Sequence, residues 1–152
     1  MNNALGAGNM DENLIRHMVL NSLRSYMRKF GEEYGEMIIC SDDRNYWRAD
    51  TFPEYKGNRK RDGGKNDIDW NELFRILNKI RDEIRDNFPY KNIQVPHAEA
   101  DDIIGTICHE LGTDFGAQGE PILILSGDKD FKQLQTYNNV KQYAPIQKKW
   151  LV

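Results

Sequence analysis

Two stretches decide the fold: 92–103, which reads NIQVPHAEADDI, and 122–131, which reads ILILSGDKDF. Each opens with apolar residues typical of a short strand and then turns acidic. Between them, apolar residues recur at helical spacing from about 98 to 111, and Gly112 is expected to end that helix. The residues expected to be buried are Ile103, Ile104, Ile107 and Leu111. A strand, a helix and a second strand in this order predict a βα unit with parallel strands.

Helices and strands also alternate on both sides of this unit. The further expected elements are a helix over 11–30 with Asp11 as N-cap, a buried strand over 37–40, a helix opened by a capping box of Asp69 and Glu72, and a hairpin of 140–143 with 149–152. We therefore predict an α/β fold with a mainly parallel sheet and helices on both faces. In such folds the functional crevice lies beyond the carboxyl ends of the strands.

Acidic residues gather at that predicted edge of the sheet. Three separate segments supply them: Asp42 with Asp43, then Glu99, Asp101 and Asp102, then Asp128 with Asp130. Each has an ordinary explanation by itself, because acids cap helix N-termini and Asp is common in turns. Together they repel, since two like charges about 4 Å apart cost about 4 kcal/mol at an effective dielectric of 20. A crevice that holds them all favours bound Mg²⁺ or Mn²⁺, the cations that oxygen ligands select.

The composition of the 152 residues excludes several classes of protein. No apolar run is long enough for a membrane helix, and no signal peptide is visible. The two cysteines form no spaced framework, which indicates a reducing intracellular compartment, and neither zinc nor P-loop spacing occurs. Net charge is −3, yet 56–65 is basic, 97–120 is acidic, and lysines return from 129 onward. This segregation suits a polyanion held by its backbone, although a charge run is more often solvated surface.

The order of these motifs resembles that of the 5′ nucleases. The stretches that carry the resemblance are Asp42 after a strand, Tyr55-Lys56-Gly57-Asn58-Arg59, Glu99-Ala100-Asp101-Asp102-Ile103, and Ser126-Gly127-Asp128-Lys129-Asp130-Phe131. The family includes flap endonucleases, the 5′-nuclease domain of bacterial DNA polymerase I, phage exonucleases and phage ribonucleases H. The likeness covers roughly residues 10–152. It implies that 1–152 is a partial 5′-nuclease catalytic domain of PIN-like fold, with 44–68 as a basic, arch-like segment.

The resemblance also implies roles for individual residues. Asp42, Glu99, Asp101 and Asp128 are expected to surround a first Mg²⁺ ion, and Asp130 to lean toward a second. Asp102 is expected to be an additional acid of the site, and Asp43 to be merely exposed. The residues expected to contact nucleic acid from the arch-like segment are Arg48, Lys56, Arg59 and Lys60.

The activity that the resemblance implies is phosphodiester hydrolysis at 5′ ends, by a 5′-3′ exonuclease or flap endonuclease that uses two Mg²⁺ ions, or Mn²⁺. The implied partners are DNA with single-stranded 5′ ends or flaps, RNA–DNA hybrids such as replication primers, and a replication protein such as a single-strand-binding protein. No membrane is involved, and the expected location is the cytoplasm, that of the host cell if a phage encodes the chain.

Two departures from the family pattern lead to alternatives. The 5′ nucleases begin with a strand that ends in a metal-binding Asp, and they continue into a helix–hairpin–helix region. Both lie outside 1–152, so we expect an incomplete sheet and weak or absent cleavage by this polypeptide alone. The first alternative is a nucleic-acid-binding fragment that does not cleave. The second is a PIN-type endoribonuclease, against which the long basic segment 44–68 argues.

Overall fold

The computed structural model describes residues 11–43, 69–114 and 118–152. In chain order the elements are α1 (Glu12–Tyr34), β1 (Ile38–Ser41), α4 (Trp70–Asn87), β2 (Lys91–Gln94), α5 (Ala100–Leu111), β3 (Ile122–Leu125), the 3₁₀ helix η3 (Lys129–Thr136), β4 (Val140–Ala144) and β5 (Lys149–Leu151). The alternation of helices and strands predicted from the sequence is confirmed, and the part of the chain not described includes 44–68.

Helix α1 is closed at both ends by local chemistry. The backbone N–H of Leu14 donates to Asp11 Oδ1 at 3.1 Å, so the predicted N-cap is confirmed. At the other end Gly35 has φ of 78° and its N–H donates to the Gly31 carbonyl at 2.9 Å. A positive φ of this size favours glycine, which carries no Cβ to clash with the backbone. The helix therefore stops at a residue suited to turn the chain toward β1.

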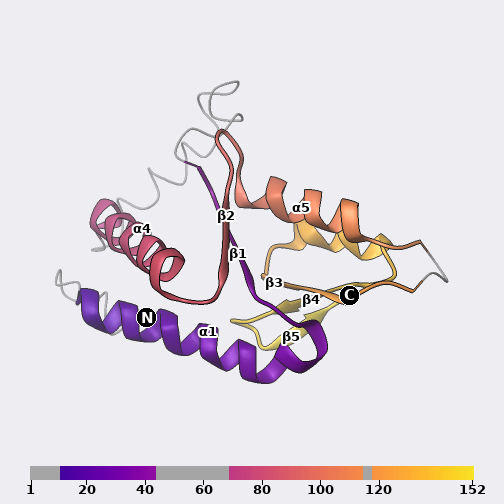
Figure 1. Ribbon diagram of the computed structural model, residues 1–152, viewed down its shortest axis with the longest axis horizontal. Coiled ribbons are helices and arrows are strands. Elements are labelled where there is room, and N and C mark those ends of the chain that lie inside the picture. Colours follow the sequence, from indigo (N-terminus) through magenta and orange to yellow (C-terminus); the bar gives the residue numbers. More distant parts are fainter. Residues whose placement is uncertain (1–10, 44–68, 115–117) are drawn as a thin grey trace.

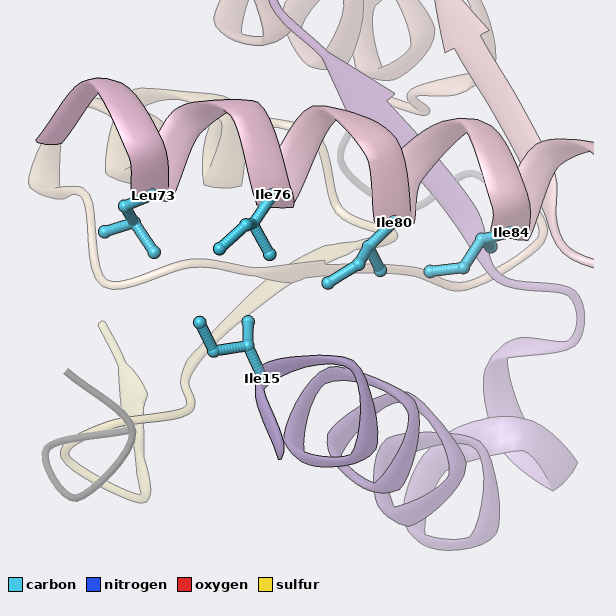
Figure 2. Packing of buried hydrophobic residues seen from close by; sticks show 5 residues of the cluster. All are labelled: Ile15, Leu73, Ile76, Ile80 and Ile84. Atoms are coloured by element: carbon cyan, nitrogen blue, oxygen red, sulfur yellow. The ribbon is translucent and has the colours of Figure 1, made fainter. Parts of the chain in front are cut away.

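Helix α4 packs on α1 through a regular apolar stripe. Its cap is the predicted one, since the Glu72 N–H donates to Asp69 Oδ1 at 3.1 Å. Figure 2 shows the stripe facing Ile15 of α1, which is 1% exposed. The buried residues of this cluster are Ile15, Leu73, Ile76, Ile80 and Ile84. Burial of each such side chain contributes on the order of 1.5–3 kcal/mol, so this contact is the main attraction between the two helices.

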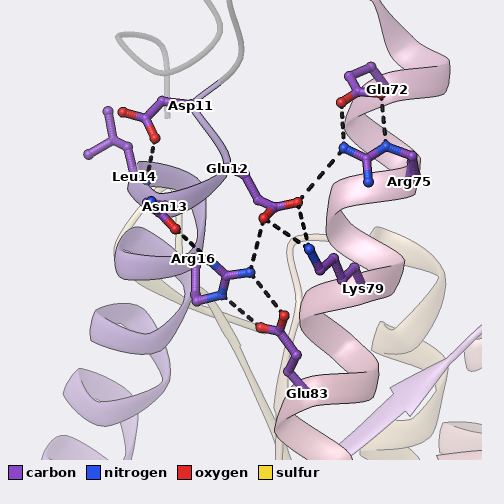
Figure 3. A network of polar contacts seen from close by, with 9 residues as sticks. All are labelled: Asp11, Glu12, Asn13, Leu14, Arg16, Glu72, Arg75, Lys79 and Glu83. Carbon is purple, nitrogen blue, oxygen red and sulfur yellow. Dashed lines mark hydrogen bonds and ion pairs between the residues drawn. The ribbon is translucent and has the colours of Figure 1, made fainter.

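A row of ion pairs borders this apolar contact on its solvent side (Figure 3). The Arg16 guanidinium lies 2.7 Å from Glu83, and the Lys79 ammonium lies 3.1 Å from Glu12. These side chains are partly or largely exposed, and such pairs contribute only about 0.2–1 kcal/mol each. The network therefore sets the alignment of α1 and α4 more than their stability.

Within the described ranges the strands form two sheets instead of the single sheet expected. β1 pairs with β2 in parallel, from Ile38 opposite Lys91 to Ser41 opposite Gln94. β3 pairs with β4 in parallel, and β4 pairs with β5 as the antiparallel hairpin that the sequence predicts. Strand directions were therefore predicted correctly.

The strand that was expected to be buried, β1, is only half-buried. β1 and β3 each pair with one strand among the described residues, so each has an edge that no strand covers there. Ile38 is accordingly 41% exposed, and Ile124 is the one fully buried residue of β3. Apolar composition alone does not distinguish an edge strand from a central one, which is why this part of the prediction was wrong.

Helices cover both faces of the β3–β4–β5 sheet, as predicted (Figure 1). On one face Cys108 of α5 packs with Ile124, Val140 and Phe131. On the other face Phe30 of α1 contacts Tyr143, with ring centroids 5.1 Å apart. Val140 and Tyr143 are three apart on β4, and side chains an odd number of residues apart point to opposite faces.

The C-terminal turn of α5 departs from the prediction. Leu111 was expected in the core but is 58% exposed, whereas Cys108 is 1% exposed. Gly112 follows the helix in an extended conformation, and a Cβ there would collide with the Cys108 carbonyl and the Tyr137 ring. The chain thus leaves α5 at a position where only glycine fits, and Leu111, one residue earlier, lies on the exposed side of the helix.

Candidate active site at the carboxyl ends of the strands

The carboxylate of Asp42 joins the end of β1 to the beginning of α5. Asp42 follows the last residue of β1, and its Oδ1 accepts a hydrogen bond from the N–H of Ala100 at 2.6 Å. Ala100 is the first residue of α5, so the carboxylate also lies at the positive end of the helix dipole. Two of the predicted acidic segments, 42–43 and 99–102, therefore meet as expected.

The acids that open α5 are partly used as caps. Glu99 is the N-cap residue and is only 1% exposed. Its N–H donates to Asp102 Oδ2 at 3.0 Å, which is the return half of a capping box. Asp101, between them in the first turn, is exposed. Asp102 thus has the structural role that the sequence left open, and Asp101 is the acid of this segment that faces solvent.

Asp43 organises the turn between β2 and α5, so the expectation that it is merely exposed was wrong. Its two oxygens accept hydrogen bonds from Gln94 Nε2 at 3.0 Å and from the N–H of His97 at 2.9 Å. His97 has φ of 66°, an uncommon conformation for a residue with a Cβ. Asp43 stabilises this conformation directly. The signal was not visible in the sequence because the partners are more than fifty positions away.

The third acidic segment lies at the beginning of η3, shortly after β3 ends. The N–H of Ser126 extends the parallel ladder by donating to the Tyr143 carbonyl at 3.1 Å. Asp128 then caps η3, since its Oδ1 accepts from the N–H of Asp130 at 2.9 Å. Both Asp128 and Asp130 are exposed. The sequence did not predict η3, because a 3₁₀ helix of this length lacks a strong periodic signal.

By donor chemistry these residues fit a hard divalent cation, because all are carboxylates. Asp42 and Asp128 each use one oxygen in a hydrogen bond. Within the described ranges, no three side chains of His, Cys, Asp or Glu come together as a group that could hold a metal ion. The ligand set of Asp42, Glu99, Asp101, Asp128 and Asp130 therefore stays a prediction, and the predicted contacts Arg48, Lys56, Arg59 and Lys60 lie outside the described residues.

A hollow of about 290 Å³ adjoins Asp43 on the side of α4. Ser41, Asn92 and Gln94 line it from the strands, and Arg81 and Arg85 line it from the helix. Both guanidiniums already pair with neighbouring acids: Arg81 lies 3.1 Å from Asp82, and Arg85 lies 3.1 Å from Asp86. Neither arginine was predicted as a site residue, because their approach to Ser41 and Gln94 arises only in the folded chain.

The two cysteines offer no thiolate chemistry at neutral pH. Burial raises the pKa of the Cys108 thiol to about 11, and the nearby Cys40 adds to that rise. Burial also raises the pKa of Cys40. Thiols with raised pKa values stay protonated and are poor nucleophiles. The carboxylates are therefore the chemically relevant groups at this edge.

Comparison with known proteins agrees with this arrangement. Residues 8–151 match the family described as 5′-3′ exonuclease, N-terminal resolvase-like domain. Ribonuclease H of Enterobacteria phage T4 is 36% identical over 141 residues, which are 91% of this chain and 45% of that protein. A 5′-3′ exonuclease of Buchnera aphidicola is 35% identical over 120 residues, 79% of this chain and 38% of that protein. The chain thus spans less than half the length of these curated relatives.

A solved structure also shares the fold. The D15 protein of T5, co-crystallised with metal ions, superposes with a TM-score of 0.66 over 89% of this chain and 49% of that chain. At 18% sequence identity this likeness bears on the fold alone. No helix among the described residues is long and apolar enough to cross a membrane.

Proposed function

The chain belongs to the 5′-3′ exonuclease family of nucleases, and from this premise we propose that it supplies the acidic face on which such a nuclease hydrolyses phosphodiester bonds at 5′ ends. The observation that carries the proposal is the bond between Asp42 and the first amide of α5, which brings acids from two strand ends together. Helix N-termini attract anions, so this edge also suits the approach of a phosphate.

We propose a division of labour among the acids. Asp42, Glu99, Asp101, Asp128 and Asp130 would hold divalent cations, Mg²⁺ or Mn²⁺, as carboxylate ligands. The chemistry that such cations supply is ionisation of water at neutral pH and neutralisation of charge on the phosphate. Asp102 orients Glu99 through the capping box, and the Ala100 N–H orients Asp42. Orientation of this kind keeps carboxylates in place before a cation binds.

The proposed substrates are 5′ flaps, single-stranded 5′ ends and RNA–DNA hybrids, including the RNA primers of replication. Support comes from the names of the relatives, a ribonuclease H and a 5′-3′ exonuclease. Lys56, Arg59, Lys60 and Arg48 would bind the phosphate backbone, where guanidinium and ammonium groups are the natural partners. A single-strand-binding protein as partner, and action in the cytoplasm, remain predictions from the sequence.

Replacement of Asp128 tests the proposal. In a chain extended by the first strand and the helix–hairpin–helix region of the family, we expect Asp128→Asn to lower the kcat for cleavage of a 5′-flap DNA with Mg²⁺ by roughly 100-fold or more. KM should change little, because a metal ligand acts mainly in the transition state. Asp114→Asn is the matched control, since Asp114 is also exposed but follows the other end of α5. Undiminished cleavage by Asp128→Asn, or cleavage that persists in EDTA, would refute the proposal.

A second candidate function is binding of nucleic acid without cleavage. One observation favours it: the described residues do not assemble a group of three donors that could hold a metal ion. The same assay separates the candidates. The second function is established if the chain shifts the 5′-flap DNA in a gel-shift experiment but does not cut it at any Mg²⁺ or Mn²⁺ concentration.

A further inference from the structure

The side chain of Gln142 is the most deeply buried polar group of the β3–β4–β5 sheet. It lies on β4 with no measurable exposure (0%), among apolar neighbours that include Val140 and Ala144 on the same strand. Gln142 and Val140 are two residues apart, so they point to the same face, the one that α5 and η3 cover. A glutamine buried in this way destabilises the folded protein unless its amide has hydrogen-bond partners.

The amide of Gln142 spans the loop that carries Asp128. Its Nε2 donates to the carbonyl of Ser126 at 2.8 Å and to the carbonyl of Asp128 at 2.7 Å. Both partners can only accept hydrogen bonds, so the atom that faces them is the nitrogen and both of its hydrogens are used. These two hydrogen bonds, which we call the clamp, lie on either side of Gly127. They hold the backbone on both sides of the turn that positions the Asp128 carboxylate.

The other half of the amide is unsatisfied. Gln142 Oε1 is buried and accepts no hydrogen bond from any residue that the structure describes. A buried acceptor without a partner is unfavourable, and an apolar side chain on β4 would avoid that penalty. The same apolar side chain would leave the two loop carbonyls without their donor. The amide therefore serves to hold the loop carbonyls, although an apolar side chain would pack better in the sheet.

We infer that Gln142 is a positioning residue that sets the Ser126–Asp130 loop and, through it, aims the Asp128 carboxylate at a divalent cation. This inference rests on the proposed function, in which Asp128 is a metal ligand. The two Gln142 hydrogen bonds involve no cation, and the bond from the Asp130 N–H to Asp128 Oδ1 lies in the same loop. Protection of the Asp130 amide therefore reports the shape of the loop in metal-free protein.

The decisive variant is Gln142→Met, which keeps the length of the side chain and removes both donors. Gln135→Met is the matched control: Gln135 on η3 also donates a side-chain hydrogen bond to a carbonyl, that of Leu151 at 3.0 Å, which lies outside the 126–128 loop. If Gln142→Met fails to fold, as judged by its thermal melt, Gln142→Asn replaces it, because the shorter amide stays polar but cannot reach both carbonyls.

Two measurements on the intact chain are needed. In metal-free protein we expect amide hydrogen exchange of Asp130 to be at least about tenfold faster in Gln142→Met, while the Ser126 amide, bonded to the Tyr143 carbonyl, stays protected. With Mn²⁺ as the probe we expect about a 10- to 100-fold weaker Kd, the usual effect of losing a residue that orients a ligand. Gln135→Met is expected to change neither quantity.

Each other outcome overturns a defined claim. Unchanged Asp130 exchange in the folded Gln142 variant shows that the clamp does not set the loop. Faster exchange with an unchanged Mn²⁺ Kd, when Asp128→Asn does weaken Mn²⁺ binding, overturns the positioning role alone. An unchanged Mn²⁺ Kd in Asp128→Asn overturns the ligand role on which the proposed function depends, and the positioning role with it.

Discussion

At the scale of single residues, Asp42 combines two duties that its sequence position alone does not reveal. As an acceptor for the Ala100 N–H it stabilises the first turn of α5, and as an exposed carboxylate it is a candidate metal ligand. Asparagine can still perform the first role, because its amide oxygen also accepts a hydrogen bond. Alanine can perform neither role. The two duties are therefore separable by mutation.

We predict that Asp42→Ala lowers the free energy of unfolding by about 1 kcal/mol, the usual effect of losing a side-chain cap, whereas Asp42→Asn lowers it by less than half as much. Both variants should lose most of the Mn²⁺ affinity of the parent. Urea unfolding monitored by circular dichroism measures the first effect and calorimetric titration the second. Equal stability of Asp42→Ala and the parent would mean that the bond to Ala100 contributes nothing.

Burial of Cys108 makes the free energy of unfolding depend on pH in the alkaline range. Its folded-state pKa is raised by burial to about 11, above the value of 9.0 for an unperturbed thiol. Between these values the unfolded chain loses the thiol proton and the folded chain keeps it, so stability must fall as pH rises. The contribution is fully present below pH 9 and is lost toward pH 11, about 2–3 kcal/mol in all.

Unfolding by urea at pH 8, 9 and 10, under reducing conditions, measures this loss. Cys108→Ala is less stable at every pH because it leaves a cavity, but its stability should decline less between pH 9 and 10 than that of the parent. Cys40→Ala is the control for the second thiol, which is only half-buried. A parent and a Cys108→Ala variant with the same pH dependence would show that this thiol does not titrate as described.

At the scale of elements, α1 and α4 are stabilised by apolar packing and aligned by charge. The four buried residues of α4 are spaced by three or four positions and face one side of the helix. The charged residues Arg16, Lys79 and Glu83 lie beside this contact and remain partly exposed. Burial of apolar area outweighs exposed ion pairs by several-fold per residue.

We predict that Ile80→Ala lowers the free energy of unfolding by about 2–4 kcal/mol, because Ile80 is 2% exposed and its loss leaves a cavity. Phe74→Ala, on the same helix but 54% exposed, should cost far less despite removing a larger side chain. Arg16→Ala should also cost less than 1 kcal/mol, an effect that salt reduces. Denaturant titrations in low and high salt rank the three variants, and the reverse order would contradict this division.

At the scale of the whole molecule, the acidic edge and the basic segment 56–65 have complementary tasks in the proposed function. The edge would hold cations at the reacting phosphate, whereas the basic segment would hold the rest of the strand by its backbone. Contacts to phosphates release counterions, so their number appears in the salt dependence of binding. Segment 56–65 lies outside the described residues, and solution binding is therefore the proper test.

We predict that the double variant Lys56→Ala with Arg59→Ala flattens the plot of log affinity against log salt. The expected change in slope is about 2 for contacts to duplex DNA and about 1.4 for a single strand. Lys79→Ala with Lys91→Ala is the control, because it removes the same charge from cations paired with Glu12 and Glu36. If both double variants change the slope equally, the segment acts only through net charge.

The sequence by itself determined the order of the described elements and, apart from η3, the elements themselves. Capping at Asp11 and Asp69, the apolar stripe of α4, the strand over 122–125 and the terminal hairpin all depend on neighbours within a few positions. Such local signals are complete in the sequence, because the groups that satisfy them are near in the chain. The motifs that identify the family are local for the same reason.

Tertiary structure alone decided which strands have open edges and which polar side chains shape the acidic site. Asp43 stabilises His97 from 54 positions away, and Gln142 holds carbonyls 14 and 16 positions away. Neither position differs in the sequence from an ordinary exposed Asp or a strand Gln. Their roles arise because buried polar groups must find partners wherever the folded chain places them, and that placement is a property of the packing of β1, β4 and α5 together.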